Sequence, residues 1–296
     1  MTRVALREFC KWRSSTWRPS LRREHRSAGS ADSVVRVPEL PEVEAYRRLA
    51  EATALNRVIT GIEAADRWYL KDEGGVAGVE ALLGHRFTRA RRRGKLLILD
   101  TGGGPTLGLR FGMTGRLVVD DVAGVEELLY SSNAPLRRFD RFAVLFRGAG
   151  RLVMRDPRRL GGVQLDPDES RLGPDALTVT TAALRVALAG SSAPLKARLL
   201  DQHRVAGVGN LIGDEVLWRA GLDPAREAGS LDAVELRRLS RVMRATIAEL
   251  VSRGGSHMGD LRPSRIAGGR CPRDGAELQR RTVGGRTTWS CPRHQR

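Results

Sequence analysis

Hydrophobic and polar residues recur along the chain with two different periods. The first regular segment begins at Pro38, where Val43, Tyr46 and Ala50 recur at helical spacing and Pro41 stands at a first-turn position. Short apolar runs separated by Gly, Pro and Asp clusters follow, and this pattern predicts the strands of a β-sandwich or barrel. The predicted strands are 95–99, 106–111, 116–119, 142–146 and 151–154.

The helical period returns between Leu177 and Arg253. We expect the last helix of this region to begin after Ser230 as its N-cap, with an apolar stripe made by Val234, Leu239, Met243, Ile247 and Val251. The earlier part, 195–218, reads as helix, glycine turn and helix, with Asn210 as the predicted N-cap of the second helix. Such a helix start can bind phosphate through free backbone N–H groups, but an ordinary capped helical hairpin fits the pattern equally well.

Composition indicates which kind of partner the protein binds and which cellular compartment it occupies. The 296 residues allow one large domain or two ordinary ones, and 51 Lys and Arg against 34 Asp and Glu give a formal charge of +17. This charge favours a polyanion such as nucleic acid, although heavy Arg usage alone could also produce it. The chain has no apolar run of membrane-spanning length, and its three cysteines are too few for a disulfide scaffold, so we expect a cytoplasmic protein without a membrane partner.

Three motifs, taken together, point to a known family. They are PELPEVE from Pro38, DPRR at Asp156 to Arg159, and the GVGN turn that ends at Asn210. In this order they resemble the formamidopyrimidine-DNA glycosylase and endonuclease VIII family of DNA repair enzymes. The resemblance implies an α+β protein with an N-terminal β-sandwich flanked by helices (38–166), a helix-two-turn-helix domain (174–258) and a zinc-finger-like β-hairpin (268–296). Residues 1–37 are predicted to be a disordered extension, absent from the mature protein.

The resemblance also implies the catalytic residues. Pro38 corresponds to the family's N-terminal proline, whose secondary amine attacks the sugar of a damaged nucleotide to form a Schiff base. Glu39 would be the adjacent acid and base, with Glu42 supporting it, although both also suit a helix start. Lys95 would contact phosphate and assist β-elimination, and Arg286 would grip the lesion phosphates and assist δ-elimination.

DNA contacts and a metal site are implied in the same way. Met113 corresponds to the side chain that fills the space of the flipped nucleotide, and Arg158 to the arginine that faces the orphaned base. Leu160, Lys196 and Asn210 complete the expected DNA-binding set. The zinc ligands would be Cys271, Asp274, Cys291 and His294, with the two-residue gaps of a zinc finger but an uncommon carboxylate. A zincless hairpin held by packing is the alternative. No organic cofactor is expected.

Three departures from the family pattern limit the choice of substrate. Leu160 stands where bacterial members usually have Phe, Phe139 replaces a His that usually contacts DNA, and only the 15 residues 256–270 separate Gly255 from Cys271. Together the short segment and Leu160 weaken an assignment to 8-oxoguanine. Pro38 is also internal in the sequence. Because an imide nitrogen cannot attack, we expect translation to start at position 37 and the initiator Met to be removed. Cleavage of a leader after Val37 is the alternative.

The sequence therefore predicts a bifunctional DNA glycosylase and abasic-site lyase that removes oxidised bases from damaged double-stranded DNA. We expect it to act as a monomer in the bacterial cytoplasm, associated with the nucleoid. The first alternative is a non-catalytic family member that binds damaged DNA with a blocked N-terminus. The second is another nucleic-acid protein with a helix-two-turn-helix, such as a ribosomal component, which would leave PELPEVE and DPRR unexplained.

Overall fold

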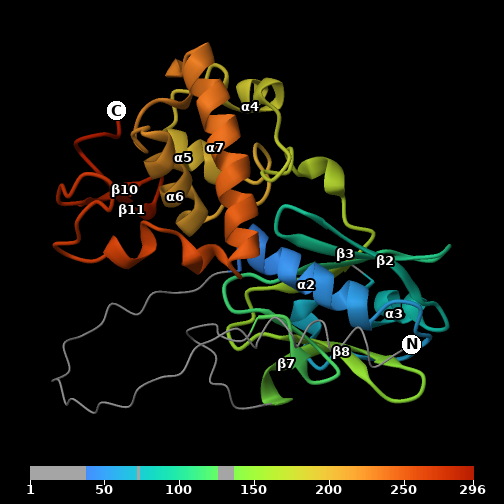
Figure 1. The fold of residues 1–296 in the computed structure, drawn as a ribbon. Coiled ribbons are helices and arrows are strands. Elements are labelled where there is room, and N and C mark those ends of the chain that lie inside the picture. The colour runs from blue at the N-terminus through green and yellow to red at the C-terminus, as the bar shows by residue number, and fades with distance from the viewer. Residues whose placement is uncertain (1–37, 72–73, 126–136) are drawn as a thin grey trace, which may run out of the picture. The chain divides into compact units, whose positions relative to one another are not determined.

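The computed structural model describes residues 38–71, 74–125 and 137–296 (Figure 1). The predicted extension 1–37, with its expected start at position 37, lies outside these residues. Within the part described, no helix is long and apolar enough to cross a membrane.

Two antiparallel sheets form the first half of the described chain. Their strand orders are β1-β7-β8-β5-β6 and β2-β3-β4-β9. The first sheet comprises β1 (Ile59–Glu63), β7 (Asp140–Phe146), β8 (Arg151–Arg155), β5 (Arg116–Val119) and β6 (Val122–Ala123), and the second comprises β2 (Phe87–Arg93), β3 (Leu96–Thr101), β4 (Leu107–Arg110) and β9 (Gly162–Leu165). Apolar residues of both sheets share one core, so the predicted sandwich has formed.

Strand β3 explains why the run Leu96 to Leu99 is apolar at every position. Leu97 and Leu99 belong to the core between the sheets, whereas Leu96 and Ile98 pack on the other side with Leu172 and Ala206. Because successive side chains of a strand point to opposite faces, a strand buried on both faces must be apolar throughout.

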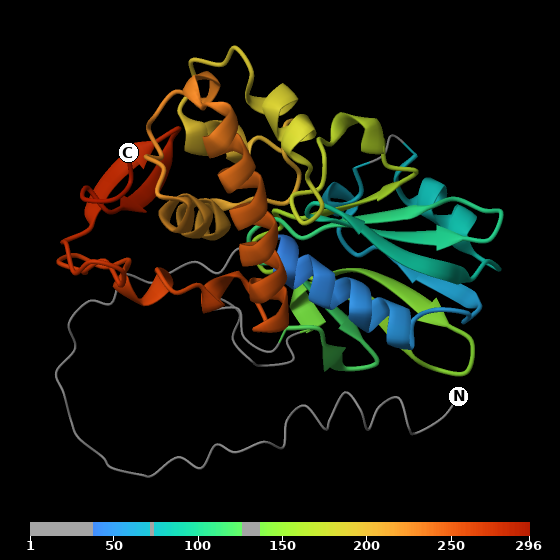
Figure 2. The ribbon, with the colours of Figure 1, turned by 45° about the horizontal axis from the view of Figure 1, so that its top comes forward.

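Helix α2 (Leu40–Thr53) packs against β2, β3 and β5 (Figure 2). Its buried face carries Val43, Tyr46 and Ala50, each with no exposed surface, as the helical spacing predicted. Leu40 at the helix start belongs to a different core, that of the helices that follow in the chain. The first turn of α2 therefore connects the sandwich to the helical region. The short α3 (Gly75–Val79) follows later in the chain.

The helical region contains α4 (Thr181–Leu188), α5 (Leu195–Leu200), α6 (Asn210–Ala220) and α7 (Ala233–Ser252) around that second core. Two predicted helix starts are wrong. Helix α6 has Gly209 rather than Asn210 at its N-cap, and α7 is capped by Asp232, which accepts hydrogen bonds from Val234 N and Glu235 N, rather than by Ser230. Val234, which the predicted apolar stripe included, lies in the first turn and is 60% exposed.

The C-terminal hairpin pairs β10 (Gln279–Val283) with β11 (Arg286–Ser290). Its turn consists of Gly284 and Gly285, with φ of 56° and 73°. A two-residue turn with positive φ at both positions matches the twist of a hairpin and favours glycine. A small core at the base of the hairpin includes Trp218 of α6 and Trp289 of β11.

Candidate functional site

The first turns of α2 and α6 meet at Glu39. Its carboxylate accepts hydrogen bonds from the backbone N–H groups of Gly209 (3.1 Å), Leu211 (2.9 Å) and Ile212 (3.0 Å). These are N–H groups at the start of a helix, which have no partner within the helix itself. Glu39, at the start of α2, therefore supplies the side-chain cap that Gly209, the N-cap of α6, cannot provide.

The glycines of two motifs are needed for this approach. A Cβ on Gly209 would lie 2.2 Å from the carboxyl carbon of Glu39, and a Cβ on Gly207, at φ 113°, would lie 2.5 Å from the side chain of Leu40. Gly94, directly before Lys95, has φ 59°, and a Cβ there would lie 2.7 Å from Ala206. The sequences around Pro38, Lys95 and Asn210 therefore meet in one place.

Glu42 joins a third segment to this junction. Its carboxylate accepts a hydrogen bond from the backbone N of Glu39 (2.9 Å) and two from Ser256, through N (2.6 Å) and Oγ (2.8 Å). Ser256 begins the 3-10 helix η6 (Ser256–Met258), which follows α7. Glu42 therefore fixes the backbone of Glu39 against the helical region, and Pro38 itself is buried beside them.

Charge and burial perturb the titratable groups here. Burial raises the pKa of Glu39, although the positive charge of Lys95 and the hydrogen bonds of α6 oppose the shift. Burial lowers the pKa of Lys95, while the charges of Glu39 and Glu42 oppose this and that of Arg286 adds to it. Lys95 therefore interacts electrostatically with Glu39 on one hand and with Arg286 on the other. Perturbed titratable groups gathered in this way are typical of active sites.

Asp156 holds together the two loops that carry Met113, Arg158 and Leu160. Its buried carboxylate accepts hydrogen bonds from the Thr114 hydroxyl (2.5 Å), Gly161 N (2.8 Å) and Arg158 N (3.2 Å). The hydroxyl of Tyr69 also donates to it, at 3.4 Å. Because every one of these groups is a donor, one carboxylate fixes both loops at once.

The side chains beyond this anchor reach the surface. Arg158 is exposed, Leu160 is 49% exposed and Met113 is half-buried. The two loops also touch directly, since a Cβ on Gly112, at φ 57°, would lie 2.4 Å from the backbone carbonyl of Leu160. Three of the predicted DNA-binding residues are therefore gathered on neighbouring loop tips.

Lys196 and Asn210 do not present their side chains freely to solvent, as DNA-binding residues were expected to. Lys196 has no exposed surface, and its ammonium forms an ion pair with Asp214 (2.7 Å) and donates to Thr288 Oγ1 (2.8 Å). A contact with DNA would require it to leave these partners. Asn210 is half-buried in the first turn of α6, and its Oδ1 is buried without a hydrogen-bond partner in the described part of the chain.

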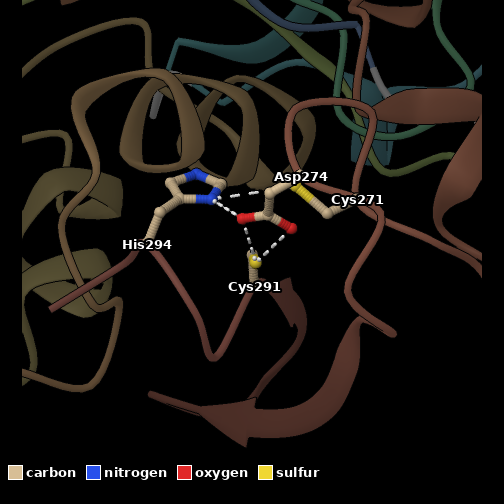
Figure 3. Close-up of side chains that lie close together, drawn as sticks. All are labelled: Cys271, Asp274, Cys291 and His294. Carbon is tan, nitrogen blue, oxygen red and sulfur yellow. Dashed lines mark hydrogen bonds and ion pairs between the residues drawn. The ribbon is translucent and has the colours of Figure 1, made fainter.

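The four predicted metal ligands lie together at the base of the hairpin (Figure 3). One ligand atom from each of Cys271, Asp274, Cys291 and His294 lies within 4.8 Å of the others. Asp274 is central, with Oδ2 at 2.8 Å from Nδ1 of His294 and 3.2 Å from Sγ of Cys291. Hydrogen bonds from Ala276 N and His294 lower the pKa of Asp274, whereas burial raises the pKa of Cys291.

The surroundings of these four residues suit a metal ion. Nε2 of His294 lies 3.2 Å from the carbonyl oxygen of Trp218, which can only accept, so this nitrogen carries the proton and Nδ1 presents its lone pair to the cluster. The indole N–H of Trp218 donates to Sγ of Cys271 at 3.3 Å. Lone pairs of nitrogen, oxygen and sulfur therefore converge, and a shared cation would relieve their repulsion. The group could bind a metal.

Sequence reasoning missed two buried carboxylates, Asp156 and Asp214. Asp156 stands inside the DPRR motif, but its contacts with Thr114 and Gly161 depend on how the sheets are arranged, which the sequence does not show. Asp214 is one of two adjacent acids early in α6, and the sequence suggests only a favourable position at a helix start. The sequence could have pointed to Asp214 in one way only. An acidic residue among the apolar residues of a helix must find a polar partner if the helix is buried.

Comparisons with known proteins identify the family of this chain. The model of the formamidopyrimidine-DNA glycosylase N-terminal domain matches residues 37–163, and that of the H2TH domain of the same enzymes matches residues 172–261. The formamidopyrimidine-DNA glycosylase of Cereibacter sphaeroides is 38% identical over 239 residues, which cover 76% of this chain and 82% of that protein. The Thermus thermophilus enzyme is 34% identical over 279 residues, 86% of this chain and 97% of that protein.

Solved structures give the same result. The Lactococcus lactis Fpg in complex with DNA containing an abasic site matches with a TM-score of 0.74 and 27% sequence identity. The match covers 88% of this chain and 100% of the Lactococcus protein. The same protein with DNA containing a formamidopyrimidine lesion, Fapy-dG, matches with a TM-score of 0.74 and 28% identity. This match covers 87% of this chain and 100% of the Lactococcus protein. With both domain models matched in order, this chain belongs to the formamidopyrimidine-DNA glycosylase family.

Proposed function

We propose that this protein is a DNA glycosylase of base excision repair that also cleaves the strand at the resulting abasic site. The observation that carries the proposal is the junction at Glu39, where the first turns of α2 and α6 meet beside Lys95 and Arg286. Its partner is damaged double-stranded DNA. The related Lactococcus lactis protein is known in complexes with DNA that carries an abasic site or a formamidopyrimidine lesion.

The proposed reaction begins with a free amine at Pro38. This nitrogen attacks C1′ of the damaged nucleotide, the bond from C1′ to the base breaks, and Glu39 protonates the ring oxygen as the sugar opens. The resulting iminium ion acidifies the C2′ proton. Its removal expels the 3′ phosphate in β-elimination, and a second proton loss, which Arg286 assists through the phosphates, expels the 5′ phosphate in δ-elimination. Lys95 binds phosphate and assists the first elimination.

The loops held by Asp156 would open the duplex for this reaction. An enzyme that acts on a base must take it out of the stack, and inserted apolar side chains compensate for the vacated space. Met113 and Leu160 are the proposed wedge, and Arg158 would face the orphaned base. The 49% exposure of Leu160 is consistent with this role, since an apolar side chain at a loop tip leaves surface that bound DNA could cover.

Replacing Glu39 by glutamine tests the proposed chemistry. Glutamine keeps only one of the two oxygens that accept backbone hydrogen bonds from α6, and it cannot supply a proton. We expect Glu39→Gln to lower excision of a formamidopyrimidine base at least about 100-fold while cleavage of a preformed abasic site continues. Gel analysis of both substrates measures this, and equal losses on both would contradict the role. Because the pKa of Glu39 is raised, its acid form persists to higher pH than in free glutamate, and excision should decline as pH rises through that pKa.

The hairpin is proposed to hold one zinc ion through Cys271, Asp274, Cys291 and His294. When bound, zinc would supply a structural link between the two ends of the hairpin, since all four positions are filled by protein. We expect about one zinc per chain by elemental analysis and its loss after chelation at low pH. Asp274→Asn should weaken retention, whereas the exposed Asp168→Asn should not. A metal-free protein with an unchanged fold would instead make this a hairpin held by packing.

A further inference from the structure

The hairpin that carries Arg286 is attached to the helices by a buried charged network. Lys196 of α5 pairs with Oδ1 of Asp214 in α6 at 2.7 Å, and neither side chain has any exposed surface. Oδ2 of Asp214 accepts a hydrogen bond from Arg265 at 2.8 Å. Two cations therefore share one carboxylate in the interior, where an unpaired charge would be costly.

This network contacts three consecutive residues of β11. Lys196 Nζ donates to the carbonyl oxygen of Thr287 (3.1 Å) and to the hydroxyl of Thr288 (2.8 Å), while the backbone N of Trp289 donates to Asp214 (3.2 Å). Its contacts with the strand therefore involve both backbone and side-chain atoms, so they fix the position of β11 and also its rotation about its own axis.

Thr288 extends the chain of hydrogen bonds to Arg286. Its hydroxyl accepts from Lys196 and donates to the carbonyl oxygen of Arg286 at 3.0 Å. The turn before Arg286 is also seated on α5, since a Cβ on Gly284 would lie 2.5 Å from Cβ of Ala197. The metal-ligand cluster anchors one end of the hairpin, and the network anchors the strand next to the other.

Fixing the backbone matters because Arg286 itself is exposed. A long, exposed side chain has many rotamers, and a two-stranded hairpin alone is only marginally stable. Without an anchor, the guanidinium would sample many positions relative to Lys95, whose pKa its charge influences. A catalytic group must instead be held close to its productive geometry.

We infer that Lys196, Asp214 and Thr288 are positioning residues, which set the backbone of Arg286 so that its guanidinium reaches the phosphates of the bound strand. This inference rests on the proposed function of Arg286 in the second elimination. It gives Lys196 a role within the protein, in place of the DNA contact that the family resemblance implied. The family resemblance implied no role for Asp214 or Thr288.

The decisive substitution is Thr288→Val, which keeps the side-chain shape but removes the hydroxyl that links Lys196 to Arg286. We expect the ratio of δ to β products on abasic-site DNA to fall about five- to tenfold, as the loss of one or two buried hydrogen bonds allows. Affinity for an uncleavable abasic analogue should change by less than about twofold. Thr288→Ser, which retains the hydroxyl, should behave as the unmodified protein, and thermal denaturation verifies that each variant folds.

The matched control is Thr282→Val, the same chemical change at an exposed position on the neighbouring strand β10. It should leave the product ratio unchanged. A second control combines Thr288→Val with Arg286→Ala. If the network acts through Arg286, the double variant should have the product ratio of Arg286→Ala alone, because coupled residues are not additive. Full additivity, or an unchanged ratio in Thr288→Val when Arg286→Ala lowers it, would overturn the inference.

The same experiment separates this inference from the proposed function. If Arg286→Ala leaves the product ratio unchanged, the role of Arg286 in elimination is wrong. The positioning claim is then decided by hydrogen exchange at the Trp289 amide, which donates to Asp214. Faster exchange in Thr288→Val than in Thr282→Val would support an anchored strand, and equal exchange would overturn it.

Discussion

A protein that begins at Pro38 is expected to form a borohydride-stable covalent adduct with abasic-site DNA, and the 296-residue chain is not. Within the chain, the nitrogen of Pro38 belongs to a peptide bond, and its lone pair is delocalised into the carbonyl group. After removal of the preceding residues it becomes a secondary amine that can attack C1′. Gel electrophoresis of the trapped complex, with mass spectrometry of the N-terminus, measures the difference directly.

Two variants of the shortened protein complete this test. Pro38→Gly should lose most trapping while still binding DNA, because it replaces the secondary amine and its fixed ring. Pro41→Ala, in the first turn of α2, leaves the terminal amine intact and should trap normally. Equal trapping by the 296-residue chain would identify another amine as the nucleophile, because the nitrogen of its Pro38 is not free. Binding without trapping by any form would favour the non-catalytic DNA-binding alternative.

Removal of the Asp156 carboxylate is expected to have the largest effect on stability. Asp156→Ala should reduce the free energy of unfolding by about 2–4 kcal/mol, since the buried Thr114 hydroxyl and Gly161 N–H lose their acceptor. Urea denaturation measures this loss. The exposed Asp168→Ala is the matched control and should cost no more than about 1 kcal/mol, because Asp168 only caps the short 3-10 helix η4 (Glu169–Arg171).

The loops held by Asp156 should also lose their function before the protein unfolds. At temperatures where Asp156→Ala is still folded, base excision should fall more than affinity for abasic-site DNA, since opening the stack needs Met113 and Leu160 in fixed positions. Arg158→Ala should weaken recognition of the orphaned base with little change in stability, because its side chain is exposed. Equal stability of Asp156→Ala and Asp168→Ala would show that the two loops are fixed by other contacts.

Local patterns were sufficient for many elements of the fold. The apolar runs of β3, β5, β7 and β8 are visible in the sequence because strands buried in a sandwich require them. Strand β2, Phe87 to Arg93, was not predicted because four of its seven residues are arginines. Several of these cations find acidic partners in three dimensions, as when Arg91 pairs with Asp100 of β3 (2.8 Å) and Arg92 pairs with Asp175 (2.5 Å).

The sequence by itself determined the family, the core face of α2 and the four residues of a cluster that could hold a metal, because these depend on residue types at short, fixed spacings. Tertiary structure alone decided which groups satisfy one another. Glu39 caps α6 from 170 to 173 residues away, Asp156 joins two loops, and Lys196 holds β11. The cap predicted at Asn210 was wrong for the same reason, whereas α7 is capped locally by Asp232, two residues after the predicted Ser230. An unpaired backbone N–H or a buried charge accepts any partner that the packing brings close, and spacing along the chain does not reveal which one.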